Sequence, residues 1–167
     1  MPNVFMPEGL IPLVMMPPEH GTTDTYDYIN VGRAQKVWID YFSQIIAATT
    51  TTVAPMKAYT AAGGGAAVLG FNVPIWYGTA TAAGLALTLT RQTDAANQAT
   101  SGAAGIHRII FEIDTSALGQ EASTPSLGKY NYISILHDAV VADFTSCTVW
   151  VLPRYASDEV TSTTWIV

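Results

Sequence analysis

The sequence is poor in charge. Only 12% of its 167 residues are Asp, Glu, Lys or Arg, while 49% are hydrophobic. A typical soluble domain has about twice this charged fraction. Seven Lys and Arg against thirteen Asp and Glu leave a formal net charge of −6, and the basic residues are scattered singly. Binding of nucleic acid or of an anionic membrane surface needs clustered basic residues, so both functions are disfavoured.

Cysteine and long apolar runs are also scarce. The one cysteine, Cys147, cannot form an internal disulfide, so no oxidising compartment is implied. It lies on the inward face of a predicted strand, where we expect a buried thiol. No apolar run approaches 18 residues, so no membrane-spanning helix is expected. The first twenty residues lack a basic segment and contain five prolines, which argues against a secretion signal.

Motifs that carry chemistry are missing as well. His20, His107 and His137 lie far apart, and none has a second His or Cys at metal-ligand spacing. We interpret His107 as a partly exposed strand residue and His137 as the end of a strand. Glu112 and Asp114 are a close carboxylate pair, which we interpret as part of a solvated face rather than a catalytic or Ca²⁺ site. The sequence therefore predicts no catalytic residue, no metal, no cofactor and no enzymatic activity.

Alternating apolar residues are the main positive feature, because this pattern is typical of half-buried β-strands. It predicts strands in five segments: Phe71–Tyr77, Leu85–Thr90, Ile109–Ile113, Ile133–Ile135 and Cys147–Val151. Small and turn-forming residues predict loops between them: Ala61–Ala67 with its flexible Gly63–Gly65, Asp94–Gly105 and Leu118–Gly128. Residues 26–46 fit either a helical face or alternation, but their β-branched and aromatic content favours two strands.

This pattern predicts an all-β protein with an antiparallel β-sandwich or jelly-roll-like domain over residues 26–156. Residues 1–25 are predicted to be an extended Pro-rich arm, since prolines prevent a regular helix yet the segment is apolar. The arm packs on its own domain as an edge segment, extends across a neighbouring subunit, or is disordered. Residues 157–167 are predicted to be a tail whose apolar end docks on its own domain or on a partner.

Aromatic residues on the outward side of a predicted strand indicate a protein contact. Trp150 alternates with Val149 and Val151 and should point outward, and such residues in a chain of low charge indicate a covered surface. Assembly is therefore the leading hypothesis. The predicted contact residues lie in the arm, in this strand and in the tail: Val4, Phe5, Leu10, Ile11, Met15, Trp150, Trp165, Ile166 and Val167.

Several segments, in order, resemble small structural proteins of tailed bacteriophages: Tyr26–Ile39, Leu85–Ala95, Phe111–Leu118, Tyr130–Asp138 and Val149–Ala156. That group has a D-Y strand entry, a T-L-x-Q-A-T-D strand, an E-hydrophobic-D strand and a late R-Y-A. Here the second motif is T-L-T-R-Q-T-D, with the alanine missing and an arginine added. The resemblance covers most of residues 26–156.

The resemblance implies a non-enzymatic virion protein, and within that class a capsid decoration (cement) protein on the outer capsid surface, synthesised in the host cytoplasm. Its implied partners are the major capsid protein or other virion proteins. A homo-oligomer, dimer or trimer, is also expected. The alternatives are a tail, neck or fibre component and, from another class, a carbohydrate-binding module that uses exposed aromatic residues.

Overall fold

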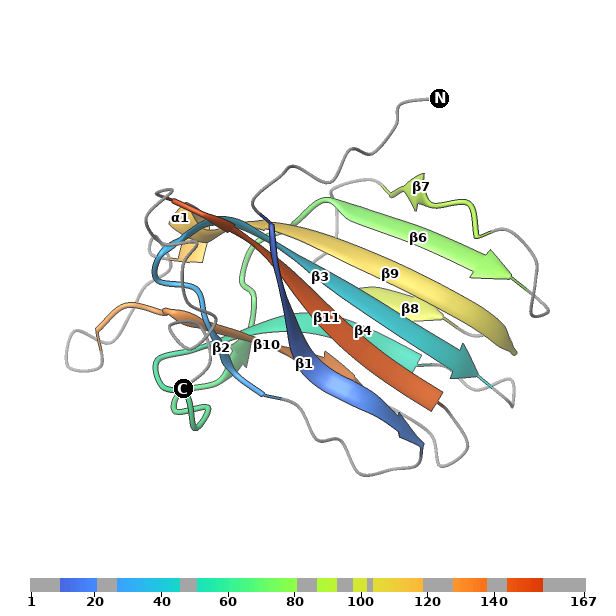
Figure 1. The fold of residues 1–167 in the computed structure, drawn as a ribbon, viewed down its shortest axis with the longest axis horizontal. Helices are drawn as coiled ribbons and strands as arrows, with labels where there is room; N and C mark the ends of the chain where they lie inside the picture. Colours follow the sequence, from blue (N-terminus) through green and yellow to red (C-terminus); the bar gives the residue numbers. More distant parts are fainter. Residues whose placement is uncertain are drawn as a thin grey trace.

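The computed structural model describes residues 10–20, 27–45, 51–80, 87–92, 98–101, 104–118, 128–137 and 144–154. Within these ranges the regular structure consists of antiparallel strands in two sheets and one four-residue helix (Figure 1). Both sheets contribute side chains to one apolar core. The predicted all-β antiparallel sandwich is therefore confirmed. In the described part of the chain, no helix has the length and hydrophobicity needed to cross a membrane.

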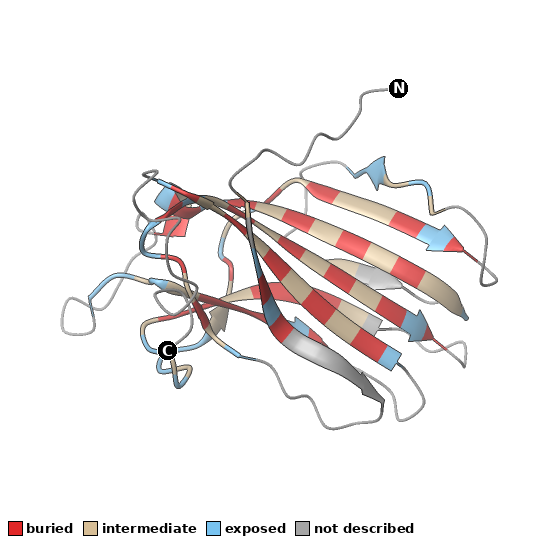
Figure 2. Ribbon diagram, viewed as in Figure 1, coloured by how far each residue is buried: buried red, intermediate tan, exposed pale blue. Residues whose placement is uncertain are grey.

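The larger sheet has six strands, each antiparallel to its neighbours. In spatial order they are β1 (Ile11–His20), β11 (Phe144–Pro153), β3 (Ala34–Ile45), β9 (Gly105–Asp114), β6 (Ile75–Ala80) and β7 (Thr90–Arg91). Along β3, β9 and β11 buried residues alternate with half-buried ones, as Figure 2 shows. Such alternation is expected of strands whose successive side chains point to opposite faces of a sheet.

The second sheet lies behind the first in Figure 1. Its main path is β2 (Ile29–Asn30), β10 (Tyr132–His137), β4 (Thr51–Ala58) and β5 (Ala67–Val68), and β8 (Ala99–Ser101) pairs with β4. The short helix α1 (Thr115–Leu118) directly follows β9. The side-chain hydroxyl of Thr115 donates to the carbonyl of Ala34 over 2.6 Å, which holds α1 against the start of β3.

The core lies between the two sheets. Ile39, Phe111 and Val149 come from the larger sheet and Ile133 and Ile135 from the smaller one, and all are fully buried. Fully burying such a side chain contributes about 1.5–3 kcal/mol. The strands predicted at 109–113, 133–135 and 147–151 are confirmed, and Cys147 is buried as predicted.

Residues 26–46 form strands rather than a helix, as predicted: β2 and β3 occupy their described part. A tight turn joins the two strands, with the amide of Ala34 donating to the carbonyl of Val31 over 3.0 Å. The side chain of Asn30 accepts from the amide of Gly32 over 2.9 Å. Asparagine side chains often stabilise turns in this way.

Strand β1 lies within residues 1–25, the segment predicted to be an extended arm. It pairs with β11, and the side chains of Leu13 and Met15 are buried in the core of the same chain. Residues 11–20 are therefore an edge strand of their own domain. The interface role predicted for Met15 is wrong, because its side chain is 0% exposed.

Four other predictions differ from the structure. In the predicted strand Phe71–Tyr77, residues 71–74 are not in a strand, and β6 begins at Ile75. Residues 87–89 precede a two-residue β7 rather than forming a strand, and Leu85 lies outside the described residues. The predicted loop Asp94–Gly105 contains β8. Gly63–Gly65 belongs to a hydrogen-bonded hairpin rather than a flexible loop, since the amide of Gly63 donates to the carbonyl of Thr60 over 3.0 Å.

Candidate functional site

The strongest candidate site is the side of the larger sheet that faces away from the core, which we call the outer face. Its residues alternate with the buried ones along each strand: Pro12 and Val14 of β1, Phe144, Thr148 and Trp150 of β11, Lys36, Trp38, Asp40 and Phe42 of β3, Arg108, Ile110 and Glu112 of β9, and Trp76 of β6. Figure 1 shows this sheet in front of the smaller one.

A row of large side chains crosses the outer face. Trp150 lies directly opposite Trp38 on β3, and on its other side it lies opposite Pro12 on β1. Both tryptophans are half-buried. Val14 follows Pro12 on the same side of β1 and is 56% exposed. Phe144 lies at the other end of β11, opposite Gln44, and is 37% exposed. The outer face therefore carries exposed apolar side chains, whereas polar residues usually predominate on a solvent-facing sheet face.

Trp150 has a second unusual property. Its indole nitrogen Nε1 is buried and has no hydrogen-bond acceptor within the described residues. Buried tryptophan N–H groups ordinarily find one. Trp150 thus lies on the outward side of β11, as the alternation predicted, and combines apolar surface with an unsatisfied donor.

The charged residues at the centre of the outer face are paired with each other. The guanidinium of Arg108 donates two hydrogen bonds to the carboxylate of Asp40, over 2.9 Å from Nε and 2.7 Å from Nη2. These bonds raise the pKa of Arg108 above its usual value. Lys36 pairs with Glu112 in the same way across β3 and β9. The centre of the face therefore carries charge but little net charge.

These contacts also decide the role of the Glu112 and Asp114 pair. Glu112 is bound to Lys36, while the carboxylate of Asp114 accepts the amide of Ser116 over 2.9 Å. The two carboxylates thus have separate partners, as expected of a solvated face. Across the described ranges, no group of three or more His, Cys, Asp and Glu residues is placed to hold a metal ion.

His107 and His137 lie inside the sandwich rather than on this face. His107 is 1% exposed, which corrects the prediction of a partly exposed residue. Its Nδ1 lies 2.8 Å from the hydroxyl of Tyr77 on the neighbouring strand β6. His137 is also buried and ends β10, as predicted. Burial is compatible with these rings because each has a tyrosine hydroxyl as a hydrogen-bond partner.

The other predicted contact residues fall in different places. Leu10 is half-buried just before β1, and Ile11 lies opposite Val151 at the start of that strand. The remaining five are outside the described residues: Val4, Phe5, Trp165, Ile166 and Val167.

Sequence reasoning missed the pairing of Trp38 with Trp150 and the two ion pairs. Alternation over residues 36–42 shows that Trp38 and Asp40 share a face. It does not show which strand lies alongside, so the partners are visible only in the sheet register.

Comparison with models of protein families found no match, and comparisons with curated proteins and with solved structures found none either.

Proposed function

We propose that this chain is a non-enzymatic structural protein of a phage virion, specifically a capsid decoration (cement) protein that binds the major capsid protein through its outer face. The observation that carries the proposal is the opposed pair Trp150 and Trp38 on a sheet face whose central charges are already paired. The bacteriophage origin and the capsid partner rest on the sequence resemblance.

The composition of the outer face suits a protein contact. The cores of protein interfaces are rich in aromatic side chains and in arginine, and they are poor in other charged residues. Covering Asp40 and Arg108 would bury a charge pair rather than a single charge, and an unpaired buried charge is far more costly. Covering Val14 and Phe144 would remove exposed apolar surface from water, which favours association.

The edges of the larger sheet support contact through its face. Edge strands are the usual sites of sheet-to-sheet pairing, and prolines on an edge prevent it because they lack an amide donor. Edge strand β1 contains Pro12, Pro17 and Pro18. In addition, the amide of Asp27 donates to the carbonyl of Met15 over 2.9 Å.

Cementing then follows from mass action. A protein that binds the assembled shell and not the separated subunits stabilises the shell by the free energy of binding at each site. Many weak sites acting on one shell add avidity. A large rigid sheet face is sufficient for this function, and no chemical step is required.

Finer features belong to the same proposal. The domain, which includes β1 as an edge strand, is jelly-roll-like, and the chain forms a dimer or trimer on the shell. Residues of the predicted arm and tail add contacts with neighbouring subunits: Val4, Phe5, Leu10, Ile11, Trp165, Ile166 and Val167.

The test compares Trp150→Ser with Leu136→Ser. Leu136 is 41% exposed on β10 of the other sheet, so it is a matched loss of apolar surface away from the outer face. Each variant is mixed with shells that lack the protein, and bound copies are counted after sedimentation. We expect Trp150→Ser to lose binding and Leu136→Ser to retain it.

Three results would contradict this proposal. Full occupancy by Trp150→Ser would remove the outer face from the contact. A copy number of roughly six or twelve per virion, rather than on the order of hundreds, would favour a neck or tail component because those structures are small rings. Tryptophan fluorescence that changes on adding glycans would instead favour a carbohydrate-binding module.

A further inference from the structure

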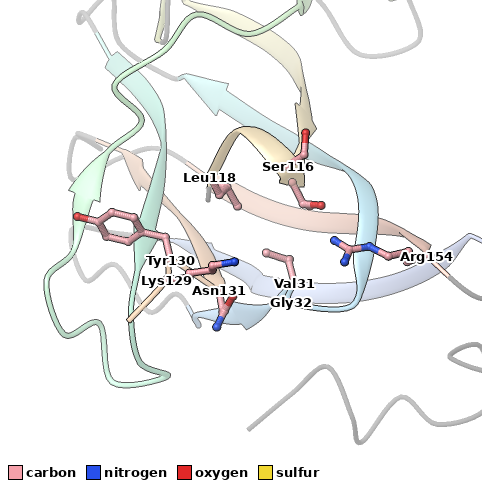
Figure 3. A pocket seen from close by; sticks show the side chains of 9 residues that line it. Val31, Gly32, Ser116, Leu118, Lys129, Tyr130, Asn131 and Arg154 are labelled. Carbon is pink, nitrogen blue, oxygen red and sulfur yellow. The ribbon is translucent and has the colours of Figure 1, made fainter. Parts of the chain in front are cut away.

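A pocket lies at the end of the sandwich where α1, the β2–β3 turn and the entry to β10 meet (Figure 3). Its volume is about 200 Å³. Pockets for drug-sized molecules are larger, roughly 300–1,000 Å³. The buried side chains of Val31 and Leu118 form part of the wall. The pocket therefore has room for a single small polar group and some water.

Two cations lie on opposite sides of the pocket. Figure 3 shows the guanidinium of Arg154 pointing toward the space between Ser116 and Val31, with Lys129 and Asn131 on the other side. Arg154 and Lys129 are both exposed. Neither makes an ion pair with a described residue, and the guanidinium of Arg154 makes one long hydrogen bond, 3.4 Å to the carbonyl of Ala34.

No acidic side chain lines the pocket among the described residues. The nearest described carboxylate in sequence is Asp114, and it accepts the amide of Ser116 over 2.9 Å. Hydrogen bonds from the side chain and the amide of Ser116, together with the charge of Lys36, lower the pKa of Asp114 below its usual value. The carboxylate of Asp114 is therefore hydrogen-bonded to Ser116 and does not neutralise Arg154 or Lys129.

Four other cations make contacts within the fold. Lys36 and Arg108 pair with carboxylates, Lys57 lies 4.4 Å from the centre of the Tyr130 ring, and Arg91 lies 5.8 Å from that of Trp76. The chain has seven Lys and Arg and a net charge of −6. A pocket with two cations and no described acid is therefore locally positive on an acidic protein.

We propose that this pocket binds a carboxylate side chain of an acidic peptide segment on a partner protein. The planar guanidinium of Arg154 matches a carboxylate through two parallel hydrogen bonds, and Lys129 supplies a second charge from the far side. The side-chain amide of Asn131, which lies beside Gly32, adds a neutral donor. A nucleic acid would need a continuous basic stripe, which two cations do not provide.

The residues that line this pocket are not part of the outer face. The proposed carboxylate binding can therefore be tested independently of the proposed capsid function. It gives the protein a second and directional attachment point, because one acidic side chain in this pocket would fix its orientation on a partner. Interactions of exposed charges are screened by salt over about 8–10 Å, so binding should weaken as ionic strength rises.

The test uses the full chain labelled with ¹⁵N, and it requires no virion. The probe is a capped Gly-Asp-Glu-Asp-Gly peptide, compared with capped Gly-Asn-Gln-Asn-Gly and with inorganic phosphate. We expect saturable amide shifts at Gly32, Ser116 and Asn131 with the acidic peptide. The double variant Lys129→Gln, Arg154→Gln should weaken binding at least about fivefold, in line with two exposed ion pairs. Arg91→Gln is the matched control and should change nothing.

The spectrum of the double variant also shows whether it is folded, and the single variant Lys129→Gln serves if it is not. Three results would overturn the proposal. These are an absence of saturable shifts at the pocket, equal binding of the neutral peptide, and tighter binding of phosphate than of the acidic peptide. Loss of shell binding by Trp150→Ser would bear only on the outer face.

Discussion

The hydroxyl of Tyr41 lies 3.3 Å from Nδ1 of His137, and this hydrogen bond joins the two sheets through the interior of the sandwich. Tyr41 is 0% exposed on β3, and His137 is 2% exposed on β10. Their rings are tilted by 53° with centres 5.7 Å apart. A polar contact in an apolar core favours one alignment of the sheets over others, because misalignment leaves a buried polar group without its partner.

Tyr41→Phe should lower the free energy of unfolding by about 1–2 kcal/mol, since His137 loses this partner while the ring volume is kept. Urea denaturation measures the change. Tyr132→Phe, at a half-buried position of β10, is the matched control and should change stability by less than about 0.5 kcal/mol. Equal effects of the two substitutions would show that the inter-sheet bond contributes nothing specific.

Cys147 should react with thiol reagents only when the protein unfolds. Its side chain is buried beside the sulfur of Met15 at 3.9 Å, and burial raises its pKa far above the usual value, so little reactive thiolate is present. Alkylation by iodoacetamide at pH 8, followed by mass spectrometry, should be at least about a thousandfold slower in the folded protein than in denaturant. Rapid labelling of the native chain would indicate local opening of β1 from β11.

Gly65→Ala should destabilise the protein more than Gly128→Ala does. Both glycines have positive φ angles, 68° and 83°, and an alanine there costs about 1 kcal/mol or more. At Gly65 a Cβ would also lie 2.6 Å from the ring of Tyr59, whereas nothing lies within 4 Å at Gly128. Tyr59 stacks on Tyr130 at 4.0 Å, so displacing it disturbs a second ring.

We expect the difference between these two variants to be about 1 kcal/mol, measured by thermal or urea unfolding. Similar losses for both would mean that Tyr59 moves aside at no cost.

Asp114 should contribute to acid sensitivity. Its pKa is lowered by hydrogen bonds from Ser116, and the charge of Lys36 acts in the same direction. Because the unfolded chain then binds the proton more tightly, this contribution is complete above the unfolded pKa and is lost as pH falls through the folded value. Asp114→Asn should therefore reduce the loss of stability between about pH 4 and pH 2.

Urea titrations of both proteins at pH 7, 4 and 2.5 would measure this effect. Ser116→Ala keeps the backbone donor and should have an intermediate effect. Parallel pH curves for wild type and Asp114→Asn would contradict the assignment.

Alternation predicts strands β9 and β11 of the larger sheet. Ile109, Phe111 and Ile113 were assigned to a buried strand face, and all three are in the core. The same spacing puts His107 on that face, two residues before Ile109. We expected it to be partly exposed because it is polar, and its bond with Tyr77 depends on a neighbouring strand that the sequence does not reveal.

Strand β4, which contains Pro55, is not among the strands predicted from the sequence. Prolines are rare in central strands, since they lack an amide donor. Pro55 nevertheless lies opposite Ile135 of β10, and its carbonyl accepts the amide of Leu69 over 3.1 Å. The N and O atoms of one strand residue point to the same side, so the missing donor of Pro55 faces Leu69 and the ladder with β10 does not need it. This arrangement depends on a residue fourteen positions away.

The outer face shows the same limit. Lys36 with Glu112 and Asp40 with Arg108 are separated by 76 and 68 residues, and they meet because β3 and β9 pair in one register. One residue of slippage would move these side chains to the opposite side of the sheet. The sequence supplies the residues of each strand, and the fold supplies their partners.

The pairing of β1 with β11 has a consequence for biosynthesis. The first described strand hydrogen-bonds with the last. Residues 11–20 therefore cannot pair in the sheet until residues 144–153 have been synthesised. A nascent chain emerging from the ribosome therefore carries its Pro-rich apolar beginning without a native partner until nearly the whole domain has been translated. Closing so long a loop is slow, and during that delay the unpaired segment depends on chaperones or on its own prolines to avoid aggregation.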